Sequence, residues 1–159
     1  MNRQKFLSLT ALGVPAFATS SLSVQSQIDP EIIKEFVIAG HNDLKKVETM
    51  LVSTPQLIHS THDWGNGDFE QAIEGAGHLG DTEIVHFLIQ KGARINIFIL
   101  TLLGKIQVIK PIIEEFPALL TSVGPHGFSL LHYAKMGGEN AKITAEYLME
   151  KGLNKTKFQ

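Results

Sequence analysis

The sequence contains no cysteine among its 159 residues. This absence excludes disulfides, thiolate zinc sites, thiol nucleophiles and the acylated cysteine of a lipoprotein. Net charge is also scarce, since 14 basic and 16 acidic residues give −2 at pH 7. Because the basic residues are scattered and form no stripe, we expect no nucleic-acid partner. The length and the 43% hydrophobic content fit one compact unit or a short solenoid.

Sequence signatures of several enzyme classes are missing as well. No serine occupies the centre of a G-x-S-x-G motif. The glycine-containing stretches 65–67 and 124–127 lack both the Lys-Ser/Thr of a P-loop and the three-glycine spacing of a dinucleotide site. The acidic pair Glu114 and Glu115 falls on a helix face that should meet solvent. We therefore expect no catalytic activity and no cofactor.

The N-terminus has the three parts of an export signal in the required order. Arg3 and Lys5 precede the apolar run 6–14, and Ala16-Phe17-Ala18 follows as a small-x-small cleavage site. The run is much shorter than the roughly 20 residues of a membrane span. We expect a signal peptide over 1–18, a flexible spacer over 19–29, and a periplasmic or secreted location. A cytosolic protein with an amphipathic N-terminus remains the alternative.

Residues 3–7, Arg-Gln-Lys-Phe-Leu, resemble the R-R-x-F-L motif of a bacterial twin-arginine signal. Gln4 stands where the second arginine belongs. The export route, for a folded or an unfolded chain, is therefore left open.

From residue 29 onward, apolar residues recur at helical spacing in pairs of segments joined by glycine turns. Four such copies can be traced, with turns at Gly40, Gly80, Gly104 and Gly138. The intervals between these glycines are uneven, and only the last is close to a period of about 33. Pro111 lies in the rear segment of the third copy and predicts a kink or a late helix start there.

Residues 127–138, GFSLLHYAKMGG, resemble the G-x-T-P-L-H-x-A-A-x-x-G core of an ankyrin repeat. Residues 80–96 resemble the G-H-x-x-I-V-x-x-L-L-x-x-G-A-D-V-N ending of such a repeat. The resemblance covers roughly residues 30–152 and implies an all-α, short ankyrin-type solenoid of about four helix-turn-helix repeats. A helical-hairpin array of another repeat family is the alternative. Residues 153–159 are expected to be a frayed tail.

Within the fourth copy, each motif residue has a physical interpretation. Gly127 permits a tight turn, and Ser129 can cap the first helix. Leu131 and Ala134 should point into the helix interface, and His132 should hydrogen-bond back to the turn.

Ankyrin-repeat proteins usually bind a partner with their turn tips and the exposed face of their front helices. The resemblance therefore implies a monomeric, non-catalytic module that binds a protein partner and does not span a membrane. The positions that match this surface, or lie near it, are Trp64, Asn66, His78, Leu79, Pro125, His126, Phe128 and Met136. Trp64 fits an exposed anchor and a core plug equally well, and Leu79 and Met136 could instead pack between repeats.

A second hypothesis is a small metal-dependent hydrolase or metal sensor. His59, His62 and Asp63 place two imidazoles and a carboxylate within five residues, and these are zinc-ligand types. The spacing lacks the fixed helical register of H-E-x-x-H, and a solvated Ser/Thr-rich turn explains the same residues.

The export signal predicts that the mature chain begins at Thr19, because signal peptidase cleaves after a small-x-small site. Intact-mass measurement of protein from the producing cell tests this. Protein that retains Met1 and stays in the cytosol would contradict the export prediction.

Overall fold

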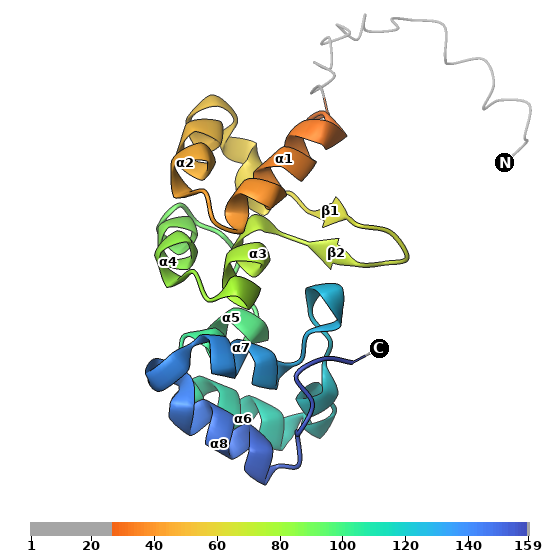
Figure 1. The fold of residues 1–159 in the computed structure, drawn as a ribbon, viewed down its shortest axis with the longest axis vertical. Coiled ribbons are helices and arrows are strands. Elements are labelled where there is room, and N and C mark those ends of the chain that lie inside the picture. The colour runs from red at the N-terminus through yellow and green to blue at the C-terminus, as the bar shows by residue number, and fades with distance from the viewer. Residues whose placement is uncertain (1–26, 159) are drawn as a thin grey trace, which may run out of the picture.

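A computed structural model describes residues 27–158, which are mostly helical and form four consecutive helix pairs (Figure 1). The predicted signal peptide and the first part of the predicted spacer lie outside these residues. The first helices of the pairs, here called front helices, are α1 (Pro30–Gly40), α3 (Ala72–Leu79), α5 (Ile97–Leu102) and α7 (Leu130–Met136). The rear helices are α2 (Leu44–Ser53), α4 (Thr82–Gln90), α6 (Ile106–Glu115) and α8 (Lys142–Glu150).

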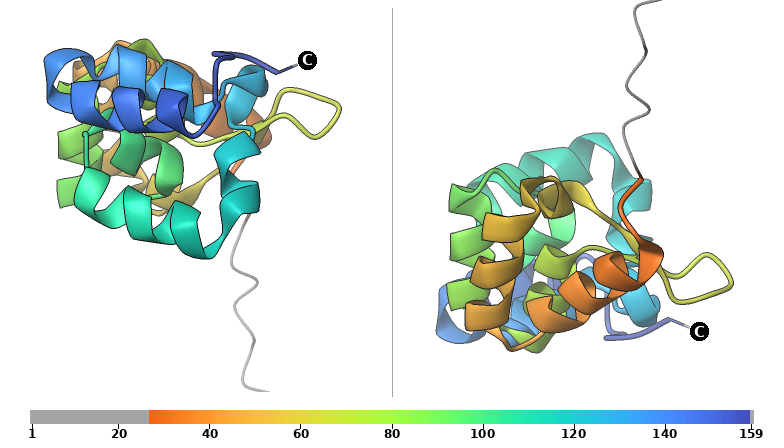
Figure 2. Two further views of the ribbon diagram at one scale, coloured as in Figure 1. Left: turned by 90° about the horizontal axis from the view of Figure 1, so that it is seen from below. Right: turned by 90° about the horizontal axis from the view of Figure 1, so that it is seen from above.

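The first and second pairs follow one another along the long axis of the molecule, and the third and fourth pairs lie side by side at its lower end (Figure 1). Each front helix packs on the next, from α1 to α3 to α5 to α7, and each also packs on the rear helix of its own pair. Seen from above, the first pair lies over the later ones (Figure 2). The prediction of an all-α fold is confirmed to the extent that the described residues are mostly helical.

A two-stranded antiparallel hairpin projects from the side of the stack between the first two pairs (Figure 1). Strand β1 (His62–Asp63) pairs with β2 (Phe69–Glu70), with His62 opposite Glu70. Short 3-10 turns complete the connections at Pro55–His59, Pro117–Thr121, Pro125–Gly127 and Gly138–Ala141. The turn at Pro125–Gly127, here called the fourth tip, lies just before α7.

Local sequence signals explain where the helices start. Asp29 caps α1 by accepting a hydrogen bond from the amide of Glu31, and Pro30 occupies the first helical position. The side chain of Asp81 caps α4, and that of Ser129 caps α7. The predicted capping role of Ser129 is therefore confirmed.

A single hydrophobic core runs through the stack. Leu131 and Ala134 are each 1% exposed, as the motif predicts. Gly104 turns α5 into α6 with φ +64, where a side chain would be strained, and an added Cβ would meet the backbone oxygen of Asn140. The third turn therefore needs glycine in order to pack against the fourth pair.

The late helix start predicted as one of the two possible effects of Pro111 does not occur. Helix α6 begins at Ile106 and continues through Pro111 to Glu115, so no late start occurs. Pro111 leaves the carbonyl of Gln107 without its helical donor, but the helix is exposed at both residues, so water can satisfy that group.

The C-terminal residues 153–158 pack against the fourth pair instead of fraying. Leu153 is buried, the amide of Ser129 donates to the Thr156 carbonyl at 3.0 Å, and the Phe158 amide donates to the Gly127 carbonyl at 2.8 Å.

No helix among residues 27–158 is both long and apolar enough to cross a membrane.

Leu88 is 1% exposed in the shared core. Replacing it with alanine should cost about 2–5 kcal/mol in unfolding free energy, because transfer energy is lost and a cavity remains. Denaturant unfolding measures this. Val52, 85% exposed on α2, is the control, and Val52→Ala should change stability by no more than about 0.5 kcal/mol. A loss below about 1 kcal/mol for Leu88→Ala would mean that α4 has a different register.

Candidate functional site

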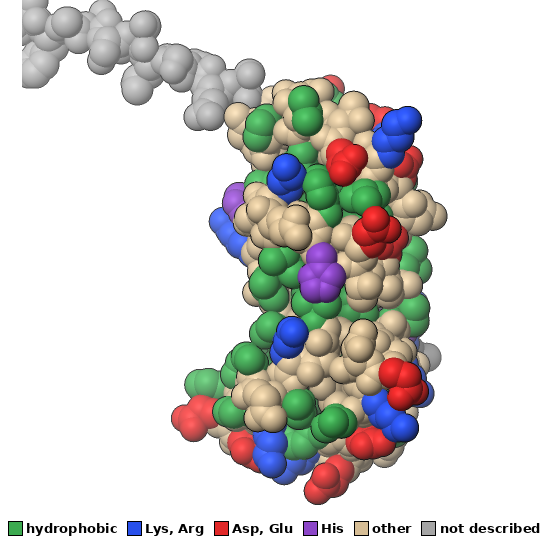
Figure 3. Space-filling view, turned by 90° about the vertical axis from the view of Figure 1, so that its left-hand side faces the viewer, with side chains coloured by type: hydrophobic (Ala, Val, Ile, Leu, Met, Phe, Trp, Pro, Cys, Tyr) green, Lys and Arg blue, Asp and Glu red, His purple; other side chains and the backbone are tan. Residues whose placement is uncertain are grey.

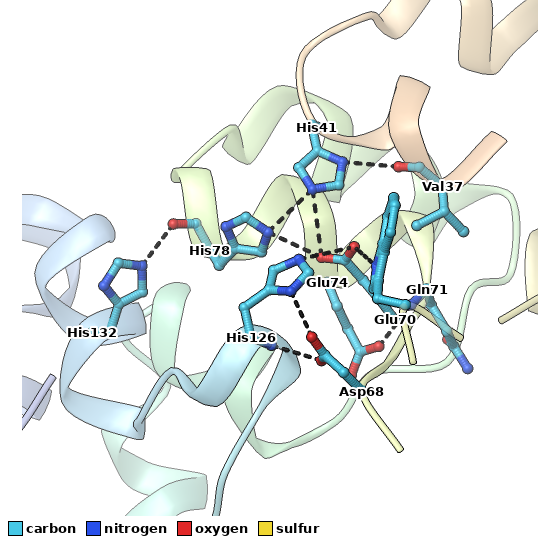
Figure 4. A network of polar contacts seen from close by, with 10 residues as sticks. Val37, His41, Asp68, Glu70, Gln71, Glu74, His78, His126 and His132 are labelled. Carbon is cyan, nitrogen blue, oxygen red and sulfur yellow. Dashed lines mark hydrogen bonds and ion pairs between the residues drawn. The ribbon is translucent and has the colours of Figure 1, made fainter. Parts of the chain in front are cut away.

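Four polar side chains from four separate segments converge beside the hairpin (Figure 4). His41 follows α1, Glu70 lies in β2, His78 is in the last turn of α3, and His126 is in the fourth tip. One potential ligand atom from each lies within 4.8 Å of the others. We call these four residues the His/Glu cluster.

Glu70 is the centre of this cluster. Its side chain is completely buried. One oxygen, Oε1, lies 3.0 Å from His78 Nε2 and 3.5 Å from His41 Nε2. The other, Oε2, accepts a 2.8 Å hydrogen bond from Trp64 Nε1 and lies 3.4 Å from His126 Nε2. Burial alone would raise the pKa of Glu70, but the His78 hydrogen bond, the nearby His41 and the Trp64 hydrogen bond together lower it below its ordinary value.

The imidazole of His41 is oriented by the backbone of α1 and by a glycine of α3. Its Nδ1 lies 3.0 Å from the carbonyl oxygen of Val37, which can only accept a hydrogen bond, so Nδ1 carries the proton. A Cβ at Gly75 would lie 2.9 Å from the Nδ1 and Cε1 atoms of this ring. Glycine at position 75 thus makes room for His41 and lets Nε2 face Glu70.

His126 is held by Asp68 of the hairpin. The Asp68 carboxylate accepts two 2.8 Å hydrogen bonds, from the amide and from Nδ1 of His126. Burial raises the pKa of Asp68, but these hydrogen bonds and the charge of His126 outweigh it, so the pKa lies below its ordinary value. His126 has φ 58, an uncommon conformation for a residue other than glycine, and the two bonds help to maintain it.

His78 lies between the other two imidazoles. Its ring is 6% exposed and makes edge contacts with the rings of His41 and His126, with centroids 5.0 and 5.3 Å away. Its backbone carbonyl accepts a 2.8 Å hydrogen bond from Nε2 of His132. His132 therefore bonds to the second pair and not to its own turn, which corrects the sequence prediction. Burial lowers the pKa of His132, against the opposing effect of this hydrogen bond.

The predicted partner-contact residues fall into three groups by exposure. His78 and Pro125 are buried and therefore present almost no exposed area in this structure. His126 and Phe128 are half-buried, and the ring of Phe128 stacks on that of His132 with centroids 3.9 Å apart. The exposed members are Trp64, Asn66, Leu79 and Met136.

Trp64 combines the two roles that the sequence left open. Its ring is 36% exposed and lies edge-on to His62, with centroids 4.4 Å apart. Its indole nitrogen nevertheless donates into the His/Glu cluster. It is therefore both a surface residue and a hydrogen-bond donor to a buried carboxylate.

The metal set expected from the sequence does not form. Within residues 27–158, His59, His62 and Asp63 do not come together as a group of ligands. His59 is exposed at the end of a 3-10 turn, and Asp63 accepts a hydrogen bond from the amide of Gly65 in its own hairpin. His41 and Glu70, which do meet in the His/Glu cluster, carry no local spacing signal in the sequence.

A cleft of about 790 Å³ lies next to the cluster. It is bounded by the hairpin, the fourth tip, α5 and the C-terminal residues, and His126 belongs to both the cleft and the His/Glu cluster. A different face of the molecule shows hydrophobic side chains interspersed with charges of both signs (Figure 3).

Comparison with protein-family models, curated proteins and solved structures found no match.

The Asp68–His126 contact predicts that Asp68→Ala will lower the unfolding free energy by about 1–3 kcal/mol, because two partly buried donors lose their acceptor. Denaturant melts measure the loss, and amide exchange at His126 should become faster. Asp63→Ala is the matched control, since Asp63 bonds only within the exposed hairpin tip. Equal losses in the two variants would show that the Asp68–His126 contact contributes nothing specific.

Proposed function

We propose that the chain is an exported, monomeric, non-catalytic interaction module of the ankyrin type. Four stacked helix pairs, in which front helix packs on front helix, support a solenoid whose repeats contact their neighbours. The matches at residues 80–96 and 127–138 support the ankyrin family in particular. The N-terminal charge, apolar run and cleavage site support delivery to the periplasm or the exterior.

The partner is a protein segment that enters the cleft between the hairpin and the fourth tip. The observation that carries this part of the proposal is the cleft itself, which lies on the side of the turn tips where ankyrin-type modules bind. Its lining includes three residues proposed from sequence: Asn66, Pro125 and His126. Pro125 is buried and shapes the wall, whereas Asn66 is exposed at the rim.

The lining combines exposed apolar groups with charges of both signs. Phe69 and Val123 are 58% and 56% exposed, and Phe98 and Phe158 form deeper apolar surface. Lys157 from the C-terminal residues and Asp68 from the hairpin supply opposite charges at the edge. A peptide with one apolar anchor side chain, flanked by polar groups, matches this lining, because a few buried anchors carry most of the energy of an interface.

The alternative centred on His59, His62 and Asp63 has no geometric support, because these side chains do not converge among residues 27–158. We therefore place partner recognition on the cleft, with no reaction assigned to it.

Val123→Glu should weaken partner binding tenfold or more, a loss of about 1.4 kcal/mol, because it puts a charge on the apolar wall of the cleft. The partner is first identified by photo-crosslinking from position 123 in the producing cell, and its affinity for each variant is then measured with purified proteins. Val52→Glu is the matched control, because Val52 is 85% exposed on α2 and does not line the cleft. Loss of binding in Val52→Glu with full binding in Val123→Glu would place recognition on the rear helices and reject the cleft.

A further inference from the structure

We propose that His41, Glu70, His78 and His126 form a zinc site that fastens the hairpin and the fourth tip to the first two helix pairs. This inference goes beyond partner binding and does not depend on it. It also departs from the sequence-based expectation that no cofactor is bound. Zinc prefers four nitrogen, sulfur or carboxylate-oxygen ligands in a tetrahedron, and the cluster offers three imidazole nitrogens and one carboxylate.

The spacing of the His41, His78 and Glu70 donor atoms fits one face of such a tetrahedron. With zinc–ligand bonds of about 2.0–2.1 Å, neighbouring donor atoms should be about 3.3 Å apart. The observed distances are 3.0 Å from His78 Nε2 to Glu70 Oε1, 3.2 Å from His78 Nε2 to His41 Nε2, and 3.5 Å from His41 Nε2 to Glu70 Oε1. His126 Nε2 lies 3.4 Å from Glu70 Oε2. One ligand atom from each of the four residues, His126 included, lies within 4.8 Å of the others.

The tautomers of two imidazoles provide an independent argument. His41 uses its Nδ1 proton on the Val37 carbonyl, and His126 uses its own on Asp68. In the neutral rings, both Nε2 atoms therefore carry a free lone pair, and both face the carboxylate of Glu70. Two lone pairs and a carboxylate converge on one small volume, where a cation stabilises all three. A metal-bound histidine whose other nitrogen donates to a carbonyl or a carboxylate is the usual arrangement in metal sites.

The charge of Glu70 supports the same conclusion. A fully buried carboxylate needs a compensating positive charge or several hydrogen bonds. Across residues 27–158, the groups within ion-pair distance of Glu70 are imidazoles, with no lysine or arginine among them. Trp64 and His78 hydrogen-bond to the carboxylate, and a bound Zn²⁺ would add a positive charge while the imidazoles remain neutral.

The ligand types favour zinc or a similar first-row transition metal. Mg²⁺ and Ca²⁺ prefer oxygen ligands, whereas imidazole suits zinc and its first-row neighbours. Because all four ligands come from the protein, the site is closed, which is typical of a structural zinc and not of a catalytic one that keeps an open position.

Zinc titration of the full-length protein, first stripped with EDTA and then followed by calorimetry, tests the site. We expect one Zn²⁺ per chain, a higher melting temperature with zinc, and no binding of Mg²⁺. His41→Gln and His126→Gln should each weaken zinc binding about 100-fold, since removal even of an outer-shell partner costs about 10–100-fold. His86→Gln is the matched control, because His86 is an exposed histidine of α4 outside the cluster.

The absence of stoichiometric zinc would overturn the proposal, and so would equal affinities in all three variants. If a ligand variant fails to fold by circular dichroism, Co²⁺ bound to the wild-type protein decides instead. Four-coordinate d–d bands and an X-ray absorption shell with imidazole scattering would support the site, whereas an octahedral spectrum would reject it. Partner binding through Val123 is measured separately, so the two proposals can fail independently.

Discussion

The carboxylate of Glu70 is the constraint around which the tip side of this molecule is organised. An ionised carboxylate loses several kcal/mol of solvation when it is removed from water, and only well-placed partners offset that loss. Here the partners come from α1, α3, the hairpin and the fourth tip. If the hairpin or the fourth tip moved away, the carboxylate of Glu70 would lose polar partners and remain in apolar surroundings. The two strands are too short to impose this geometry by themselves.

The helical framework could be predicted because its signals are local. Asp29-Pro30 and Ser129 mark helix starts through hydrogen bonds to amides two or three residues away, and the apolar spacing around Leu88 identifies a buried face. Such signals lie within one or two helical turns of the sequence, so they can be recognised without knowledge of the tertiary structure. Pro111 does not delay the start of α6, because this helix packs on α5 and α8 in the folded protein.

The His/Glu cluster could not be predicted, because no local spacing connects its members. His126 matches a turn tip and His78 the end of a front helix in the ankyrin pattern, which indicates their approximate positions but not the directions of their side chains. Glu70 has no distinguishing neighbour in the sequence, and its role depends on where the hairpin lies relative to His41, His78 and His126. Gly75 is the one indirect signal, since a glycine inside a helix costs about 1 kcal/mol and usually has a packing reason. Here that reason is the ring of His41.

The bond between Asp68 and His126 joins positions 58 residues apart, whereas neighbouring pairs of a linear array touch mainly across short sequence distances. In such an array an end unit can detach while the rest stays folded. The bond ties the hairpin to the fourth tip, and α3 also packs directly on α7, so the C-terminal unit cannot detach without breaking both contacts. Unfolding of this molecule should therefore be closer to all-or-none than the stepwise unfolding of an open-ended stack. Because the contact joins distant parts of the chain, the loop closure that forms it should also slow folding.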